Sequence, residues 1–82
     1  MDISNALAVS INREQRSLTL NYVPRTARTI YDLCDLNGRV IRTGPIFDRE
    51  TTLDISDLNG RGYVMLIVDG DTVLSKRISL AT

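Results

Sequence analysis

The stretch Tyr63–Leu80, YVMLIVDGDTVLSKRISL, decides the fold class of this chain. Its first six residues are all apolar, a pattern typical of a central strand that is covered on both faces. The triplet Asp69-Gly70-Asp71 then predicts a hairpin turn, and the alternation from Val73 onward predicts the return strand. The two faces of that return strand hold Val73, Ser75, Arg77 and Ser79 on one side and Leu74, Lys76, Ile78 and Leu80 on the other.

The rest of the chain repeats this pattern of short alternating segments between polar or glycine-containing turns. The further predicted strands are Ala6–Ile11, Leu18–Tyr22, Thr29–Asp35, Val40–Gly44 and Thr52–Ile55. Asn37-Gly38 suits the two positive-φ positions of a type I′ hairpin. About seven short strands with a turn signal roughly every 8–12 residues predict an all-β fold, an immunoglobulin-like antiparallel β-sandwich, with a single domain over residues 1–82.

The composition indicates what fills the core of such a sandwich. Aromatic residues are few and tryptophan is absent, so the core is expected to consist of leucine, isoleucine and valine. The single cysteine, Cys34, allows no intramolecular disulfide and is expected to be a small buried residue. The facing of Tyr31 and Leu33 relative to Cys34 stays open, because a one-residue slip exchanges core and surface.

The residues that carry enzyme or metal chemistry are missing or isolated. There is no histidine, which removes the commonest general base and the commonest metal ligand. The paired aspartates fall at predicted strand ends or turns, where aspartate commonly bonds the local backbone. Asp69-Gly70-Asp71 is interpreted as a turn and not as part of a calcium site, which needs at least six ligands. We therefore expect no catalytic residues, no metal site, no cofactor and no enzyme activity.

The overall charge argues against nucleic acid as a partner. Ten basic and ten acidic residues give a net charge of zero. Arg25 and Arg28 lie near each other, as do Arg39 and Arg42, but acids interrupt the surface. No run of 18 apolar residues is present, so no membrane span is expected. The N-terminal residues lack the basic start and apolar stretch of a signal peptide, so the chain is either cytosolic or a piece of a longer exported protein.

One short motif occurs twice. The pentapeptide Asp35-Leu36-Asn37-Gly38-Arg39 returns 22 positions later as Asp57-Leu58-Asn59-Gly60-Arg61. Two copies are too few for a repeat architecture, so we interpret them as one favourable turn used twice.

Three segments resemble the C-terminal sorting domains of the type IX secretion system of Bacteroidetes. Cys34–Val40 resembles the family's Y-D-L-x-G-R-x-V hairpin, and Leu53–Leu58 followed by Gly62-Tyr63-Val64 resembles its I-D-L-S-x-L-P-x-G-x-Y segment. Lys76-Arg77-Ile78 resembles its terminal K-K-I-V strand. The resemblance covers roughly residues 29–80, in the same order.

The resemblance implies a seven-stranded sandwich that acts as an address. In that family the outer-membrane translocon recognises the domain in the periplasm, and a sortase-like peptidase usually removes it. It implies a protein partner, a location from the periplasm to the cell surface or medium as part of a longer exported chain, and a set of recognition residues. That set is Asp35, Gly38, Arg39, Gly62, Tyr63, Lys76 and Arg77.

Two other functions fit the same residues. The first is a small secreted or periplasmic immunoglobulin-like module that binds a protein or glycan. The second is a structural domain that dimerises through an edge strand, because an unpaired edge is a natural docking template.

Overall fold

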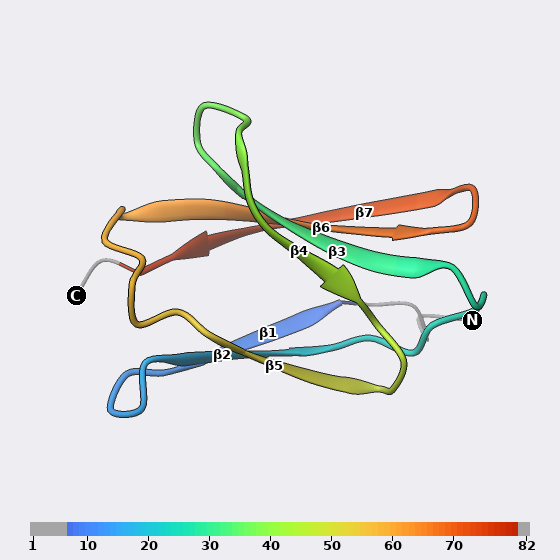
Figure 1. The fold of residues 1–82 in the computed structure, drawn as a ribbon, viewed down its shortest axis with the longest axis horizontal. Coiled ribbons are helices and arrows are strands. Elements are labelled where there is room, and N and C mark those ends of the chain that lie inside the picture. The colour runs from blue at the N-terminus through green and yellow to red at the C-terminus, as the bar shows by residue number, and fades with distance from the viewer. Residues whose placement is uncertain (1–6, 81–82) are drawn as a thin grey trace.

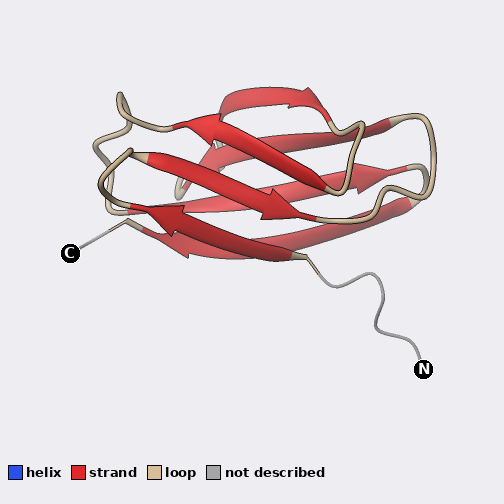
Figure 2. Ribbon diagram, turned by 90° about the horizontal axis from the view of Figure 1, so that it is seen from below, coloured by secondary structure: helices blue, strands red, loops and turns tan. Residues whose placement is uncertain are grey.

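The computed structural model describes residues 7–80 as two packed β-sheets (Figure 1). Strands and loops account for the described chain in Figure 2. The strands are β1 (Ala8–Asn12), β2 (Ser17–Asn21), β3 (Thr29–Asp35), β4 (Val40–Pro45), β5 (Glu50–Asp54), β6 (Gly62–Asp69) and β7 (Thr72–Ser79). One sheet has the order β1-β2-β5 and the other has the order β4-β3-β6-β7, with every pair antiparallel. This confirms the predicted all-β sandwich of seven strands.

The strand order differs in one place from the constant-type immunoglobulin arrangement. In that arrangement the fourth strand lies beside the fifth, in the sheet that holds the first two strands. Here β4 pairs with β3 instead, so β3, β4, β6 and β7 form the wider sheet. The short β3–β4 connection explains the pairing, because a tight hairpin keeps consecutive strands adjacent.

Alternation along the strands places one face of each sheet in a shared core. In β2 and β6 every second side chain is buried, as period-two geometry requires. The side chains with almost no exposed surface are Leu18, Leu20, Tyr22, Leu33, Met65 and Ile67.

The core differs in composition from the expected leucine, isoleucine and valine. All three tyrosines are buried, and Met65 is fully enclosed, whereas Phe47 lies in the β4–β5 loop with 78% of its surface exposed. A tyrosine can enter a core where its hydroxyl finds a partner. The hydroxyls of Tyr22 and Tyr63 both have such partners, which composition alone does not reveal.

The position of β6 is confirmed, but its expected coverage on both faces is wrong. The strand pairs with β3 on one side and β7 on the other. Tyr63, Met65 and Ile67 face the core, whereas Val64, Leu66 and Val68 on the opposite face are only half-buried. No described element covers that outer face, so neighbouring side chains of the same sheet give it its partial shelter.

A bulge resolves the facing of the β3 side chains. Leu33 pairs with Arg42 and Cys34 pairs with Val40, so Ile41 is the extra residue of β4. Tyr31 and Leu33 point into the core, and Cys34 lies on the opposite face of the sheet. Cys34 is nevertheless buried, as expected for a lone cysteine, with 6% of its surface exposed.

The β3–β4 turn is not the type I′ turn that Asn37-Gly38 suggests. The Gly38 amide donates to the Asp35 carbonyl at 3.1 Å, and the Asp35 amide donates to the Arg39 carbonyl at 2.9 Å. Gly38 alone has a positive φ, of 88°, in this turn. These features define a three-residue loop, a type I turn followed by a glycine bulge. The Asp35 carboxylate selects this form, because it accepts hydrogen bonds from the amides of Asn37 and Arg39.

The repeated pentapeptide does not form the same turn twice. Its second copy, residues 57–61, lies in the connection that carries the chain from β5 in one sheet to β6 in the other. There Gly60 has no positive φ, and its amide donates to the Tyr63 hydroxyl at 2.6 Å. Because the flanking segments join different sheets, no hairpin can form at this copy.

The bounds of β3 are those predicted, and the bounds of the other strands differ from the predicted ones by one or two residues. Ala6, the first residue of the first predicted strand, lies outside the described residues. Tyr22 and Ile55 follow the ends of β2 and β5, yet their amides donate to the carbonyls of Arg49 and Arg16, both at 2.9 Å. The pairing thus extends by one bond beyond each ladder.

Candidate recognition surface

The β3–β4 hairpin carries three of the predicted recognition residues and projects beyond the two layers (Figure 1). The backbone and the carboxylate of Asp35 both form hydrogen bonds within the turn itself. Gly38 provides the left-handed backbone, and Arg39 is exposed beside it. Nothing lies within 4 Å of a Cβ atom added at Gly38, so the tip is open to a partner. Arg39 is the residue of this group that can make a forked contact to an acid.

Gly62 and Tyr63 lie at the start of β6, beside the hairpin. A methyl group added to Gly62 would meet Leu36 at 3.1 Å, so this glycine lets the hairpin pack closely. Tyr63 is a core side chain, and its hydroxyl holds the β5–β6 connection through the Gly60 amide. Asp35, Gly62 and Tyr63 thus line one shallow hollow. In this hollow the Tyr63 side chain supports the fold and is little accessible to a partner.

Lys76 and Arg77 lie on β7, away from the hairpin tip. Lys76 pairs with Met65, and Arg77 pairs with Val64. The two cations therefore project from opposite faces of the strand, and both are exposed. Lys76 is on the same face as the buried Ile78, so it is an inward-facing charge on an edge strand. The structure brings the predicted residues together in two groups and does not form one continuous site.

Strand β7 pairs with β6 on one side, and no described strand pairs with its other side. The β6–β7 loop has two residues, since Asp69 pairs with Thr72. Hydrogen-bonded and non-bonded pairs alternate from such a turn. Counting from Thr72 along β7, the residues whose backbone groups point to the open edge are Val73, Ser75, Arg77 and Ser79.

The carboxylate of Asp69 organises the opposite end of the sandwich. It is 3% exposed and accepts hydrogen bonds from three hydroxyls and two backbone amides, at 2.6–3.0 Å. The donors are the hydroxyls of Tyr22, Thr26 and Thr29 and the amides of Arg25 and Thr26.

These contacts shift two acidities in opposite directions. Although burial by itself raises the pKa of Asp69, the hydrogen bonds outweigh it and hold the pKa far below its ordinary value. Burial, together with the bond to Asp69, raises the pKa of Tyr22 to about 12. Both oxygens of Asp69 are used inside the protein, which agrees with the interpretation of this segment as a turn. Among residues 7–80, no three His, Cys, Asp or Glu side chains gather as they would around a metal ion.

An ion pair joins the β4 edge to the β5–β6 connection. Arg42, on the inner face of β4, donates to both carboxylate oxygens of Asp57 in the β5–β6 connection. The contact with Arg42 lowers the pKa of Asp57, and the contact with Asp57 raises the pKa of Arg42. Asp57 belongs to the second copy of the repeated motif, so this copy positions a crossover and not a hairpin.

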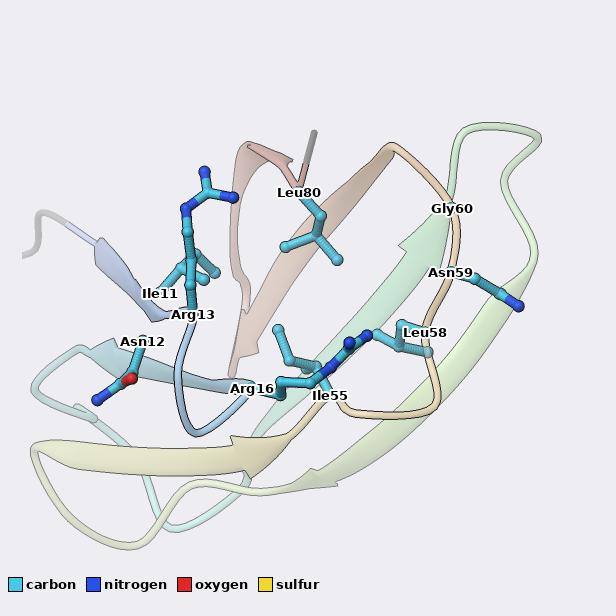
Figure 3. A pocket seen from close by; sticks show the side chains of 9 residues that line it. All are labelled: Ile11, Asn12, Arg13, Arg16, Ile55, Leu58, Asn59, Gly60 and Leu80. Atoms are coloured by element: carbon cyan, nitrogen blue, oxygen red, sulfur yellow. The ribbon is translucent and has the colours of Figure 1, made fainter. Parts of the chain in front are cut away.

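A pocket that the sequence did not predict opens where β1 ends (Figure 3). It has a volume of about 260 Å³, and three segments form it: the end of β1 with the β1–β2 turn, the β5–β6 connection and the residue after β7. Its apolar residues are Ile11, Ile55, Leu58 and Leu80, and its polar ones are Asn12, Arg13, Arg16 and Asn59, with Gly60 completing the wall. Figure 3 shows Arg16 extending toward Leu58, with Arg13 across the opening beside Ile11.

No protein-family model matches this sequence, and no curated protein matches it. Within residues 7–80, no helix is long and apolar enough to cross a membrane.

Proposed function

We propose that this chain is a recognition domain, similar to the C-terminal sorting domains of the type IX secretion system, and that its partner is a protein that pairs with the open edge of β7. The observation that carries the proposal is the unpaired side of this eight-residue strand among the described residues. Strand addition to such an edge gives affinity through backbone bonds and specificity through alternate side chains.

The charges on β7 support selective docking. An inward-facing charge on an edge strand discourages indiscriminate pairing with other strands, and Lys76 is such a charge. A partner strand with a well-placed acid would neutralise Lys76, whereas an apolar strand would leave it unpaired. Arg77 adds a second cation on the outer face, and Arg39 a third at the hairpin tip.

An export assay tests the proposal. Residues 1–82 are fused to the C-terminus of a periplasmically targeted fluorescent protein, in a Bacteroidetes host with or without a working type IX translocon. We expect translocon-dependent appearance of the fluorophore at the surface or in the medium. Equal retention in the periplasm of both hosts would contradict the sorting role.

One substitution in the fusion tests the edge itself. Ser75→Pro removes a backbone donor that points away from β6, so the β6–β7 ladder keeps its bonds. Ser75→Ala is the matched control, because it changes the same side chain and retains the N–H group. We expect S75P to stop export and S75A to leave it unchanged.

The second candidate is a freestanding binding module for a protein or glycan. The exposed hairpin tip at Gly38 and Arg39 favours it, since a projecting loop on a rigid scaffold is a common binding element. This function would leave the fusion in the periplasm of both hosts, while the purified chain would still bind a ligand through Arg39.

A further inference from the structure

The pocket beside the end of β7 combines an apolar floor with positive charge. Ile55 is buried, and Ile11, Leu58 and Leu80 are half-buried around it. Arg16 is exposed at the pocket, and no acid stands among the described residues that line it. Such a surface is complementary to an aliphatic group that has a carboxylate close by.

Backbone hydrogen bonds hold the walls of this pocket in place. The Ile55 amide donates to the Arg16 carbonyl at 2.9 Å, which ties the β5–β6 connection to the β1–β2 turn. The Leu80 amide donates to the Arg61 carbonyl at 2.8 Å, which ties the end of β7 to the same connection. A pocket formed in advance spares a ligand the cost of ordering it.

The geometry of the β1–β2 turn fixes the position of Arg16. Its φ of 53° makes it the one non-glycine residue with a left-handed backbone in the described chain. This conformation closes the turn between Asn12 and Ser17, which pair with each other. Hydrogen bonds from Ser56 are the main cause of the lowered pKa of Asp54, and the Arg16 guanidinium contributes only weakly to it. The side chain of Arg16 is exposed at the pocket.

The size of the pocket favours one side chain of a peptide over a whole small molecule. Pockets for small molecules usually measure about 300–1,000 Å³, and this one is smaller. It also adjoins Leu80, directly after Ser79, whose backbone groups point to the open edge of β7. A peptide strand added to that edge would pass beside the pocket and could place a side chain in it.

We propose that this pocket receives an aliphatic side chain of an extended partner peptide, and that Arg16 binds an acidic residue two positions away in the same peptide. A spacing of two puts both side chains on the same face of the added strand. The proposal rests on the recognition role of the β7 edge and names the chemistry of the partner. Pairing with the β7 edge alone does not require the partner peptide to contain an acidic and an aliphatic residue, whereas this proposal does.

Binding of a synthetic peptide to the purified chain tests this. The probe is a fluorescein-labelled octapeptide of threonine, with one leucine and one glutamate two positions apart, measured by anisotropy at low salt. We expect it to bind at least about tenfold more tightly than peptides in which leucine becomes threonine or glutamate becomes glutamine. Amide resonances of Ile11, Ile55, Leu58 and Leu80 should shift on binding.

Arginine variants then assign the acid contact. In R16Q the preference for glutamate over glutamine should fall to roughly twofold or less, and R16K should keep part of it. Arg28→Gln is the matched control, since Arg28 is an exposed loop arginine outside the pocket. A glutamate preference that survives R16Q would overturn the assignment, as would binding that is equal for all peptides or absent at about 1 mM.

Two further outcomes separate the proposals from one another. Octanoate is offered as a competitor, and if it binds as tightly as the peptide, the site belongs to small aliphatic acids and the peptide proposal fails. Selective peptide binding without translocon-dependent export would contradict the sorting role alone. Export without any peptide preference would contradict the pocket proposal alone.

Discussion

The hydroxyl of Tyr22 donates a hydrogen bond of 2.6 Å to the carboxylate of Asp69, which lies 47 positions later in the chain. The bond connects the end of β2 in one sheet to the end of β6 in the other. Thr29, at the start of β3, donates to the same carboxylate at 2.8 Å. One buried acid thus fixes how the two sheets meet at this end of the sandwich.

Replacement of this acid should destabilise the fold strongly. In Asp69→Asn an amide N–H₂ group faces donors that previously bonded a carboxylate oxygen. We expect the free energy of unfolding to fall by about 3 kcal/mol or more, because buried donors lose charged partners. Urea unfolding followed by far-ultraviolet circular dichroism measures this. The control is Asp71→Asn, at an exposed position of the same hairpin, which should change the free energy of unfolding by less than about 0.5 kcal/mol. Equal effects of the two variants would contradict the stabilising role of the Asp69 carboxylate.

The same carboxylate should give the protein an acid-sensitive stability. Its pKa is far below the ordinary value in the folded state, so the unfolded chain binds the proton more readily. The contribution is complete above the unfolded pKa of about 3.9 and is lost as the pH falls from there toward the folded pKa. We expect the stability difference between the wild type and D69N to shrink steadily below about pH 4. A difference that stays constant from neutral pH to about pH 2 would show that Asp69 is not the group responsible.

Ionisation of the Tyr22 phenol should lower the stability of the folded protein at alkaline pH. Its pKa of about 12 lies above the ordinary value of 10.0, so the folded state favours the neutral phenol. The contribution is complete below pH 10.0 and is lost as the pH rises toward about 12. Tyr22→Phe has no phenol to ionise, so its stability relative to the wild type should improve over this interval. Unfolding measured against pH checks this, with Tyr63→Phe as the comparison.

Local patterns in the sequence were sufficient to predict the strands but not the contacts between distant segments. The alternation around Leu18 and Leu20, or Leu74 and Ile78, reports directly which face is buried, so seven strands and the sandwich class could be predicted. The Asp69 cluster could not, because its donors come from segments 40 to 47 positions away. The sequence shows only an aspartate before a glycine, which is typical of an ordinary turn.

The candidate site was predictable to a similar degree. The open β7 edge follows from the order of strands. Alternation along β7 places Arg77 on the outer face and Lys76 on the inner face, so it does not by itself predict that Lys76 is exposed. The pocket beside Leu80 needs three segments to meet, and the β5–β6 connection that supplies Leu58 was interpreted as a second copy of the β3–β4 turn. Asn-Gly also fits both a two-residue and a three-residue loop, and the Asp35 carboxylate decides between them.

The β3–β4 turn should show a backbone requirement at Gly38. With φ at 88° and no atom within 4 Å of a Cβ placed there, the cost of a substitution comes from the backbone conformation of the new residue. We expect Gly38→Ala to lower the free energy of unfolding by about 1–2 kcal/mol and Gly38→Asn to lower it by less, since asparagine tolerates the left-handed region better. Thermal unfolding of the three proteins measures this. Equal losses for alanine and asparagine would point to contacts at the tip and not to backbone strain.

The thiol of Cys34 should be almost inert in the folded protein. Burial raises its pKa, and the negative charges of Asp32 and Asp35 raise it further, so little thiolate forms near neutral pH. Its surface is also closed to reagents, because it lies in the outer face of β3 between paired residues of β4 and β6, Val40 and Val64. We expect 5,5′-dithiobis(2-nitrobenzoate) to react at pH 8 at least about a hundredfold more slowly with the folded chain than with the chain in guanidinium chloride. Asp32→Asn separates the two causes. If the negative charge of Asp32 dominates, the reaction rate of the folded variant rises with its thiolate fraction. If the closed surface dominates, as the burial of Cys34 indicates, the reaction rate stays low until the sheet opens. Rapid reaction of the folded wild type would contradict both, and would mean that the β3–β4 hairpin leaves the sheet readily.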